Sequence, residues 1–450
     1  MRKITALIVL VACFQQIHAQ SYQPTWQSLE SRPIPKWFTD AKFGIFIHWG
    51  LYSVPAWATN SYADGFGSNY SEWYWERLNN TKLKIHKEFV DFHSKNYGPN
   101  FQYQDFVTQF KAEMFEPDQW AKVLKDAGAK YVVLTSKHHD GFALWPSREA
   151  WNWNAYDAGP HRDLAGDLSA AVKKAGLHMG FYYSLYEWYS PLFNQDVNKY
   201  VEEHMLPQLR DLVNRYQPEI IWPDGEWNYN DTVWRSREFL AWLYNESPVK
   251  NTVVTNDRWG GGRDHGGFTT TEYGQGNSSM TRPWEECRGI GESFGYNRNE
   301  NLEQYQTSKS LIHMLIDIVS RGGNLLLNIG PTADGRIPVI MQQRLKDMGD
   351  WLKTNGEAIY GTTAWAGAPK STDKHVFYTR KGKDLYILLT NWKQITEVPV
   401  TGKQVEMLGY NGKITFSKKG NKTVIQAPAV TPVNNPSPYA WVYKMSGIFE

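Results

Sequence analysis

Cysteine is almost absent from the sequence, which has two among 450 residues, Cys13 and Cys287. If a leader is removed near Ala19, only Cys287 remains, and an internal disulfide is excluded. The stability of the folded chain must then come from a hydrophobic core. A chain of this length can build one, either in two or three domains or in one large barrel with a smaller partner.

An excess of charge of either sign is also missing. The chain has 48 Lys and Arg residues against 46 Asp and Glu residues, and its formal net charge is +2. Because no basic excess is there to neutralise a phosphate backbone, we predict no nucleic-acid partner. Nothing in the sequence resembles a polybasic membrane patch either.

The start of the chain has the pattern of an export signal. Arg2 and Lys3 precede an apolar run that ends at Cys13, and Ala19 lies in a plausible cleavage context. The run is too short to span a bilayer, so we predict a signal peptide over residues 1–19, no membrane span, and a periplasmic or extracellular location. The residues up to Cys13 also resemble a bacterial lipobox, so a lipid anchor at Cys13 is the alternative.

Aromatic residues, by contrast, are abundant: they make up 15% of the chain and include 21 Trp. One interpretation is that flat apolar rings are presented to a ligand, and sugars offer a matching face through their C–H groups. The other interpretation is a large aromatic core. Composition leaves both open.

From about residue 41 to 331 the chain repeats one pattern, in which a helical apolar stripe is followed by a Gly and then by a short buried strand. One example has a stripe over 120–127, Gly128, and an apolar run over 131–135. Such repeats predict an α/β fold with a parallel sheet. No Gly-rich phosphate turn follows any strand, so a (β/α)8-like barrel over residues 20–364 is favoured over a doubly wound sheet.

After Trp365 the pattern changes to short strands with turn signals between them. This change predicts a small C-terminal antiparallel β-sandwich domain over residues 365–450. No linker longer than a few residues separates the two parts, so we expect the domains to pack together.

Polar side chains follow the apolar runs of the predicted barrel, where the active sites of such barrels lie. These strand-end residues are His48, His138, His139, Asp140, Tyr182, Asp224, Glu226, Asn256, Asp257, Arg258 and Glu272. Hydrolysis of a glycosidic bond with retention needs two carboxyl groups, one of which attacks while ionised. Asp224 directly follows a strand and suits that role, with Arg258 to keep it charged. An Asp in that place can also be a helix cap or a turn residue.

A metal site is the rival interpretation, because His48, His138, His139 and Asp140 are all ligand types. Adjacent residues on a strand point to opposite faces, so His138 and His139 are not expected to share one metal. We therefore predict no metal and no cofactor. The imidazoles are expected to hydrogen-bond to sugar hydroxyls instead.

Several segments, in order, resemble one known family. They are FGIFIHWGLYSVPAW, SEWYWERL, KHHDGFALW, IIWPDGEW, NDRWG, RGIGESFGYNRNE, GGNLLLNIGP and TNGEAIYGTTAW. Together, over residues 26–365, they resemble the α-L-fucosidases of glycoside hydrolase family 29, in an exported, bacterial form. The resemblance implies a retaining exo-hydrolase that removes terminal α-L-fucose from oligosaccharides or glycoconjugates through a covalent fucosyl-enzyme intermediate.

The resemblance also implies residue roles. Asp224 matches the nucleophile, and the residues that match the binding of sugar hydroxyls are His48, Glu72, His138, His139, Tyr182 and Arg258, with Trp73 and Phe294 as aromatic walls. For the acid/base, Glu272 in TTEYG matches bacterial members and Glu285 in PWEEC matches another branch; Glu272 is preferred. Glu226 is interpreted as structural.

Two other functions remain open from the sequence. One is a retaining hydrolase for a related sugar such as an α-L-galactoside, and the other is a carbohydrate-binding protein that has lost catalysis. The second would be expected to lack a carboxylate, yet both candidates are present. We expect the loops 51–70 and 226–235, at the pocket mouth, to set the linkage and the aglycone.

Overall fold

The computed structural model describes residues 21–188, 190–263, 265–274, 282–369 and 373–449. The predicted signal peptide, with the alternative lipid anchor at Cys13, lies outside the described residues. Within the described ranges, no helix combines the length and the apolar character needed to cross a membrane.

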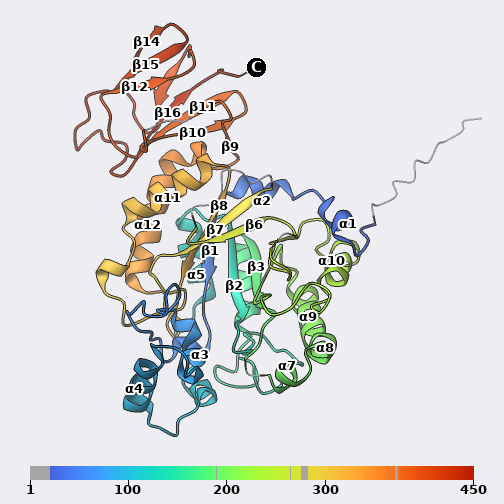
Figure 1. The fold of residues 1–450 in the computed structure, drawn as a ribbon. Coiled ribbons are helices and arrows are strands. Elements are labelled where there is room, and N and C mark those ends of the chain that lie inside the picture. The colour runs from blue at the N-terminus through green and yellow to red at the C-terminus, as the bar shows by residue number, and fades with distance from the viewer. Residues whose placement is uncertain (1–20, 189, 264, 275–281, 370–372, 450) are drawn as a thin grey trace, which may run out of the picture.

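Eight parallel strands form a curled sheet in the first domain (Figure 1). They are β1 (Phe43–Ile47), β2 (Tyr131–Lys137), β3 (His178–Ser184), β4 (Ile220–Asp224), β5 (Val254–Thr255), β6 (Thr269–Glu272), β7 (Trp284–Gly289) and β8 (Asn324–Ile329). Their hydrogen-bonded order is β5-β4-β3-β2-β1-β8-β7-β6. In the described part of the chain no ladder joins β5 to β6. Between these two strands, the N–H groups of Gly267 and Phe268 donate hydrogen bonds to the carbonyls of Asn256 and Thr255.

Helices alternate with the strands as far as β5. They are α1 (Trp26–Glu30), α2 (Lys36–Ala41), α3 (Tyr74–Asn79), α4 (His86–Tyr97), α5 (Pro117–Asp126), α6 (Leu164–Lys174), α7 (Pro191–Gln195), α8 (Val197–Tyr200), α9 (Leu206–Tyr216), α10 (Ser236–Asn245), α11 (Ser308–Ser320) and α12 (Val339–Asn355). Among the described residues none lies between β5 and β7. The predicted (β/α)8-like barrel is confirmed, with this helix-free stretch as its irregular part.

The repeat read from the sequence is reproduced closely in α5 with β2 and in α6 with β3. Strand β5 is short, because the N–H groups of Thr252 and Val253 both donate to the carbonyl of Val249 in a turn. Only Val254 and Thr255 are left to pair with β4.

Side chains of the central strands alternate between two cores. On β1, Ile45 and Ile47 pack outward against the helices, while Phe46 points into the barrel and joins a cluster with Trp222. Gly44 is required beside them, because a Cβ there would lie 2.3 Å from the ring of Tyr131. The barrel interior is therefore filled by side chains and is not a pore.

The aromatic residues serve both predicted purposes. The largest fully buried side chains include Trp49, Trp145, Trp222, Trp234 and Trp259, which are core residues. Other aromatic side chains line a cavity, as described below. The abundance of Trp thus reflects a large aromatic core together with a ligand-sized pocket.

The second domain has two antiparallel sheets, which confirms the predicted C-terminal β domain. Its strands are β9 (Thr363–Ala364), β10 (Val376–Lys381), β11 (Asp384–Leu389), β12 (Ile395–Val398), β13 (Val405–Met407), β14 (Thr415–Lys419), β15 (Lys422–Gln426) and β16 (Trp441–Met445). The orders are β13-β16-β11-β10-β9 and β12-β15-β14. Strand β9, which comes first in the sequence, lies directly before the predicted domain boundary at residue 365.

The two domains pack together through α11 and α12. His313 of α11 and Trp351 of α12 hydrogen-bond to the carbonyls of Tyr439 and Ala440. In Figure 1 the second domain lies above the barrel, whereas α3, α4 and α7, which follow β1 and β3, lie below.

Gly349 allows a close approach between two helices of the barrel, and its substitution is expected to destabilise the fold. A Cβ at this position of α12 would lie 1.9 Å from the carbonyl oxygen of Asp126, at the end of α5. We expect Gly349→Ala to lower the free energy of unfolding by about 1–3 kcal/mol, as overpacking does, despite the better helix propensity of Ala. Denaturant unfolding measures this. Gln343→Ala, at an exposed position of the same helix, should change it by less than about 0.5 kcal/mol. Equal stability of the two variants would contradict the tight contact.

Candidate active site

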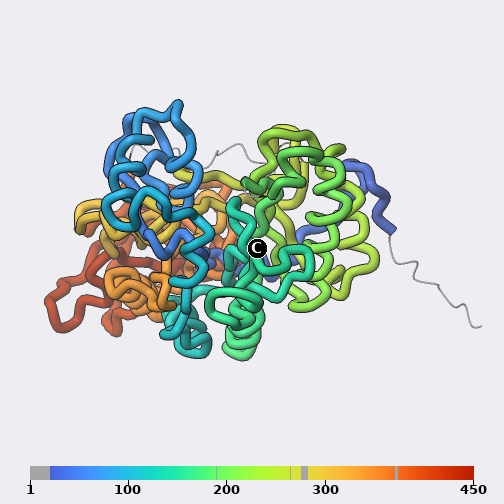
Figure 2. The backbone as a smooth tube through the Cα atoms, turned by 90° about the horizontal axis from the view of Figure 1, so that it is seen from below, coloured from blue at the N-terminus to red at the C-terminus, as the bar shows by residue number. Residues whose placement is uncertain are grey.

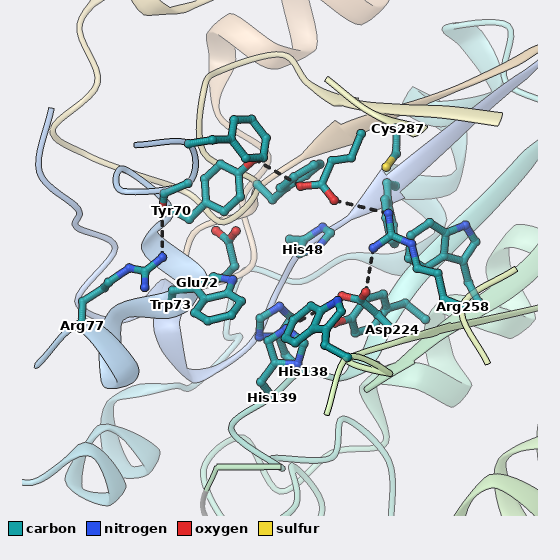
Figure 3. A pocket seen from close by; sticks show the side chains of 18 of the residues that line it. His48, Tyr70, Glu72, Trp73, Arg77, His138, His139, Asp224, Arg258 and Cys287 are labelled. Carbon is teal, nitrogen blue, oxygen red and sulfur yellow. Dashed lines mark hydrogen bonds and ion pairs between the residues drawn. The ribbon is translucent and has the colours of Figure 1, made fainter. Parts of the chain in front are cut away.

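A cavity of about 240 Å³ opens at the carboxyl ends of the parallel strands. Figure 2 views the molecule from the side of α3, α4 and α7, and shows the segments after β1 and β3 on opposite sides of this end. The described lining residues are Phe46, His48, Phe66, Gly67, Tyr70, Glu72, Trp73, Arg77, His138, His139, Tyr182, Trp222, Asp224, Trp227, Arg258, Arg263, Glu272, Cys287 and Phe294. Nearly all the residues singled out for sugar chemistry therefore meet in one place (Figure 3).

Asp224, the last residue of β4, lies at the centre of this cavity. Arg258 donates from Nη1 to Oδ1 at 2.7 Å, and the Tyr182 hydroxyl donates to Oδ2 at 2.9 Å. Burial by itself raises the pKa of Asp224, but the charge of Arg258, followed by that of His139, which is protonated at such low pH, outweighs it and holds the pKa at about 2. The carboxylate is therefore ionised at neutral pH, as an attacking group must be.

Arg258 is itself held on several sides. Its backbone N–H donates to Asn256, its Nε donates to Thr270 at 3.1 Å, and its guanidinium carbon lies 4.5 Å from the centre of the Trp222 ring. A planar cation fixed in this way presents its remaining N–H groups in defined directions. One of them points to Asp224, and the other leads to a second carboxylate.

That second carboxylate is Glu272, the last residue of β6. Its Oε2 accepts from Arg258 Nη2 at 3.3 Å, and its Oε1 accepts from the Tyr70 hydroxyl at 3.2 Å. The side chain is 24% exposed, so it reaches both the cavity and solvent. One guanidinium thus joins the two carboxylates, as the dashed lines in Figure 3 show.

Glu285, the alternative partner, lies in a different environment. It is the second residue of β7, is 1% exposed, and is not among the described residues that line the cavity. One oxygen accepts from the Tyr131 hydroxyl and the other from Trp222 Nε1 at 2.9 Å. Burial raises the pKa of Glu285 to about 7. Both of its oxygens are engaged inside the barrel, beneath the cavity.

The three histidines of the cavity are neutral. Burial lowers the pKa of His48 to about 3, lowers that of His139 to about 4, and lowers that of His138 well below its usual value. His48 Nδ1 donates to the Asn328 amide oxygen at 2.7 Å, which leaves Nε2 as an acceptor. His138 Nδ1 is buried without a hydrogen-bond partner in the described part of the chain. Such rings can donate to or accept from sugar hydroxyls.

The expectation that His138 and His139 point to opposite faces is wrong. Strand β2 ends at Lys137 after an irregularity in its pairing with β3, so both histidines follow the strand and are not bound by its alternation. Their ring centres lie 4.1 Å apart, and both line the cavity. Even so, no group of three or more His, Cys, Asp or Glu side chains among the described residues is arranged to hold a metal ion.

Glu72 and two aromatic rings form a further wall. Glu72 Oε2 accepts from the N–H of Gly295 at 2.8 Å, and burial raises the pKa of this carboxyl to about 7. Phe294 lies 4.9 Å from His48, and Trp73 lies 5.2 Å from His139, between ring centres. The wall therefore alternates polar atoms with apolar rings, which suits a ligand that has both kinds of surface.

Glu226 is buried outside this lining. Its Oε1 accepts from Arg263 Nε at 3.1 Å, and its Oε2 has no hydrogen-bond partner within the described residues. Burial and the neighbouring Asp224 raise its pKa. Its contact with Arg263 joins the loop after β4 to the loop after β5, in keeping with a structural role.

Several lining residues were not singled out from the sequence. They are Phe46, Phe66, Gly67, Tyr70, Arg77, Trp222, Trp227, Arg263 and Cys287. Loop position offered a signal for some of these, because the loops 51–70 and 226–235 were expected at the mouth and supply Phe66, Tyr70 and Trp227. Strand alternation offered another, since Trp222 shares a face with Asp224 two residues later. The same alternation puts Cys287 on the face of Glu285, two residues before it in β7.

A cavity of about 240 Å³ with two carboxyl groups at the strand ends of a parallel barrel has the features of a glycoside hydrolase site. A family model described as alpha-L-fucosidase matches residues 9–357, and one for the alpha-L-fucosidase C-terminal domain matches residues 370–446. The chain belongs to the α-L-fucosidase family, glycoside hydrolase family 29.

Individual relatives are similar to the chain along nearly its whole length. The sequence is 43% identical to plasma alpha-L-fucosidase of Rattus norvegicus, over 98% of each protein. It is also 43% identical to tissue alpha-L-fucosidase of Homo sapiens, over 95% of this chain and 92% of that one. A crystal structure of Thermotoga maritima alpha-fucosidase in complex with fucose is similar at 36% identity and a TM-score of 0.80, over 94% of this chain and 100% of that one.

Proposed function

We propose that the chain is a retaining exo-α-L-fucosidase that acts by double displacement, with Asp224 as nucleophile. The observation that carries this proposal is the contact of one buried guanidinium, Arg258, with both Asp224 and Glu272. Retaining enzymes need two carboxyl groups close together, about 5–5.5 Å apart, so that one attacks while the other protonates. A shared cation keeps the pair close and keeps Asp224 ionised.

In the first step the Asp224 carboxylate attacks the anomeric carbon, and a bond to that carbon forms as the glycosidic bond breaks. Glu272, as a carboxylic acid, gives its proton to the departing oxygen. In the second step Glu272 takes a proton from water, the water oxygen attacks the anomeric carbon, and Asp224 is released as a carboxylate. Atoms and charge balance, and the configuration is inverted twice.

Glu272 is proposed as the acid/base in preference to Glu285. Its side chain lines the cavity, is partly exposed, and can exchange protons with solvent between the two steps. Glu285 is buried, and its hydrogen-bond partners, Tyr131 and Trp222, lie inside the barrel. A general acid must reach the leaving oxygen within hydrogen-bond distance, and Glu285 is not among the described residues that line the cavity, whereas its partner Trp222 is.

The substrate proposed is a terminal α-L-fucose of an oligosaccharide or glycoconjugate. Its hydroxyls would be held by His48, Glu72, His138, His139, Tyr182 and Arg258, and its methyl group by Trp73 and Phe294. Neutral imidazoles and a carboxyl group pair well with hydroxyls, and a misplaced hydroxyl would leave one of these buried groups unpaired. The Thermotoga maritima relative has been crystallised with fucose.

We also propose that the protein is exported to the periplasm or the extracellular space. The charged start and short apolar run of residues 1–19 support a signal peptide, with a lipid anchor at Cys13 as the alternative. The mature protein would then have a catalytic domain over residues 20–364 and a β-sandwich over residues 365–450. The β-sandwich supplies none of the described cavity-lining residues.

Proton NMR of a fresh reaction tests the proposed mechanism. When the enzyme cleaves an α-L-fucoside, we expect α-L-fucose to be the first anomer observed, with the β anomer appearing later by mutarotation. Appearance of β-L-fucose first would contradict double displacement. Release of no fucose from any α-L-fucoside would contradict the proposed substrate.

A further inference from the structure

Two large aromatic side chains at the mouth of the cavity are exposed. Phe66, in the loop after β1, is 64% exposed, and Trp227, in the loop after β4, is 46% exposed; both line the cavity. The role proposed above for fucose uses neither of them. What sets them apart from other exposed rings is that they line the cavity, where an apolar surface is available to a bound ligand.

Phe66 lies on the side of the proposed acid. Its ring centre is 5.5 Å from that of Tyr70 and 5.4 Å from that of Tyr273, with edge-to-face geometry in both pairs. The Tyr70 hydroxyl donates to Glu272 Oε1, and Tyr273 directly follows Glu272. The departing oxygen must lie at Glu272, so the group attached to that oxygen must lie near Phe66.

Trp227 lies on the other side, outside the wall proposed for fucose. Its ring stacks on that of Trp73 at 5.8 Å and 28°, and lies 5.3 Å from His139, which faces Asp224. Trp227 thus extends the wall of the fucose site outward, whereas Phe66 stands where the leaving group departs. Of the two rings, Phe66 is the one placed to contact the aglycone.

The charges at the mouth favour a neutral ligand. Arg77 contacts Glu76 at 2.6 Å, and Arg263 contacts Glu226 at 3.1 Å. Together with the buried Arg258, which contacts Asp224 and Glu272, these are the Lys and Arg side chains among the described lining residues, and each already has a carboxylate partner. An anionic aglycone would meet paired cations and the nearby carboxylates, so electrostatic attraction would not favour its binding.

We propose that Phe66 forms a binding subsite for the first aglycone residue, a neutral pyranose whose C–H face stacks on the ring. This inference rests on the proposed fucosidase function and names the substrate class more closely. A pyranose with an unobstructed C–H face offers the flat apolar surface that an aromatic ring contacts well.

Two substrates with similarly poor leaving groups distinguish an effect on aglycone binding from an effect on the catalytic steps. The first is methyl α-L-fucoside, which has no aglycone ring, and the second is whichever neutral fucosyl disaccharide the wild type cleaves fastest. For Phe66→Ala we expect kcat/KM to fall about tenfold on the disaccharide and to stay within about twofold on the methyl fucoside. Phe66→Tyr keeps the ring and should retain the wild-type ratio.

Trp151→Ala is the matched control, because Trp151 is 77% exposed and is not among the described lining residues. It should leave both substrates unaffected. Equal losses on both substrates in Phe66→Ala would overturn the subsite, since Phe66 would then act through Tyr70 and Glu272. Faster cleavage of a sulfated or carboxylated disaccharide than of the neutral one would overturn the neutral class. If the wild type cleaves neither fucoside, the proposed function fails, and not only the subsite.

Discussion

Replacement of Asp224 with glycine is expected to lower kcat on an aryl α-L-fucoside by about 10⁴-fold or more, because the covalent intermediate has no attacking group. The aryl leaving group needs little protonation, so the loss reports on the nucleophile and not on the acid. Steady-state kinetics measures it. We expect the variant to fold, because Arg258 keeps Glu272 as a partner for its charge. Circular dichroism and a melting curve test whether it does.

Azide rescue identifies the missing group chemically. In Asp224→Gly the vacated space lets azide attack the anomeric carbon directly, with one inversion, so β-L-fucosyl azide should form from an α-fucoside. Asp224→Asn, which fills the space, should be inactive and not rescued by azide. Undiminished turnover in Asp224→Gly would contradict the assignment of Asp224 as nucleophile. Rescue that gives the α azide would show that another residue still forms the intermediate.

The part of the site that the sequence could predict is the part carried by strand ends. Asp224, His48 and Arg258 each follow an apolar run, and parallel strands bring their carboxyl ends to one edge. The positions of the three residues after these runs are sufficient to place them together at one end of the barrel. The family resemblance then supplied Glu72 and Phe294, which no strand pattern marks.

The rest depended on features that apolar patterns do not encode. Strand β6 has the sequence TTTE and only one buried residue, so it has no apolar run of its own, and only its place among the other strand-end residues pointed to Glu272. The register of β7 places Glu285 opposite Asn324, at the start of β8. That register, and not composition, puts Glu285 below the cavity and Glu272 beside it.

His138 and His139 show the same limit in a different way. Alternation along a strand predicts opposite directions for neighbours, but the rule ends where the strand ends. Because β2 stops at Lys137, the two rings both reach the cavity. Strand termini are the least predictable part of an element, and catalytic residues of a barrel lie at those termini.

Exchange of Glu272 for alanine is expected to lower kcat/KM by about 10²–10⁴-fold on fucosides with poor leaving groups, the usual contribution of a general acid. On substrates with activated leaving groups the first step needs no proton, so the loss should be far smaller. Azide should then restore turnover by attacking the fucosyl-enzyme intermediate. Two inversions in sequence make α-L-fucosyl azide the expected product, the opposite anomer from that formed by Asp224→Gly.

Glu285→Gln is the matched control for this exchange. The amide keeps the shape of the side chain and can still meet both Tyr131 and Trp222, so activity on poor leaving groups should stay within about threefold of wild type if Glu285 is not the acid. Glu272→Gln, of the same chemistry at the other position, should lose activity as Glu272→Ala does. If Glu285→Gln shows the selective loss on poor leaving groups and Glu272→Gln does not, then the buried carboxyl is the acid. In that case its proton must reach the leaving oxygen past Trp222, which would require the ring to move when substrate binds.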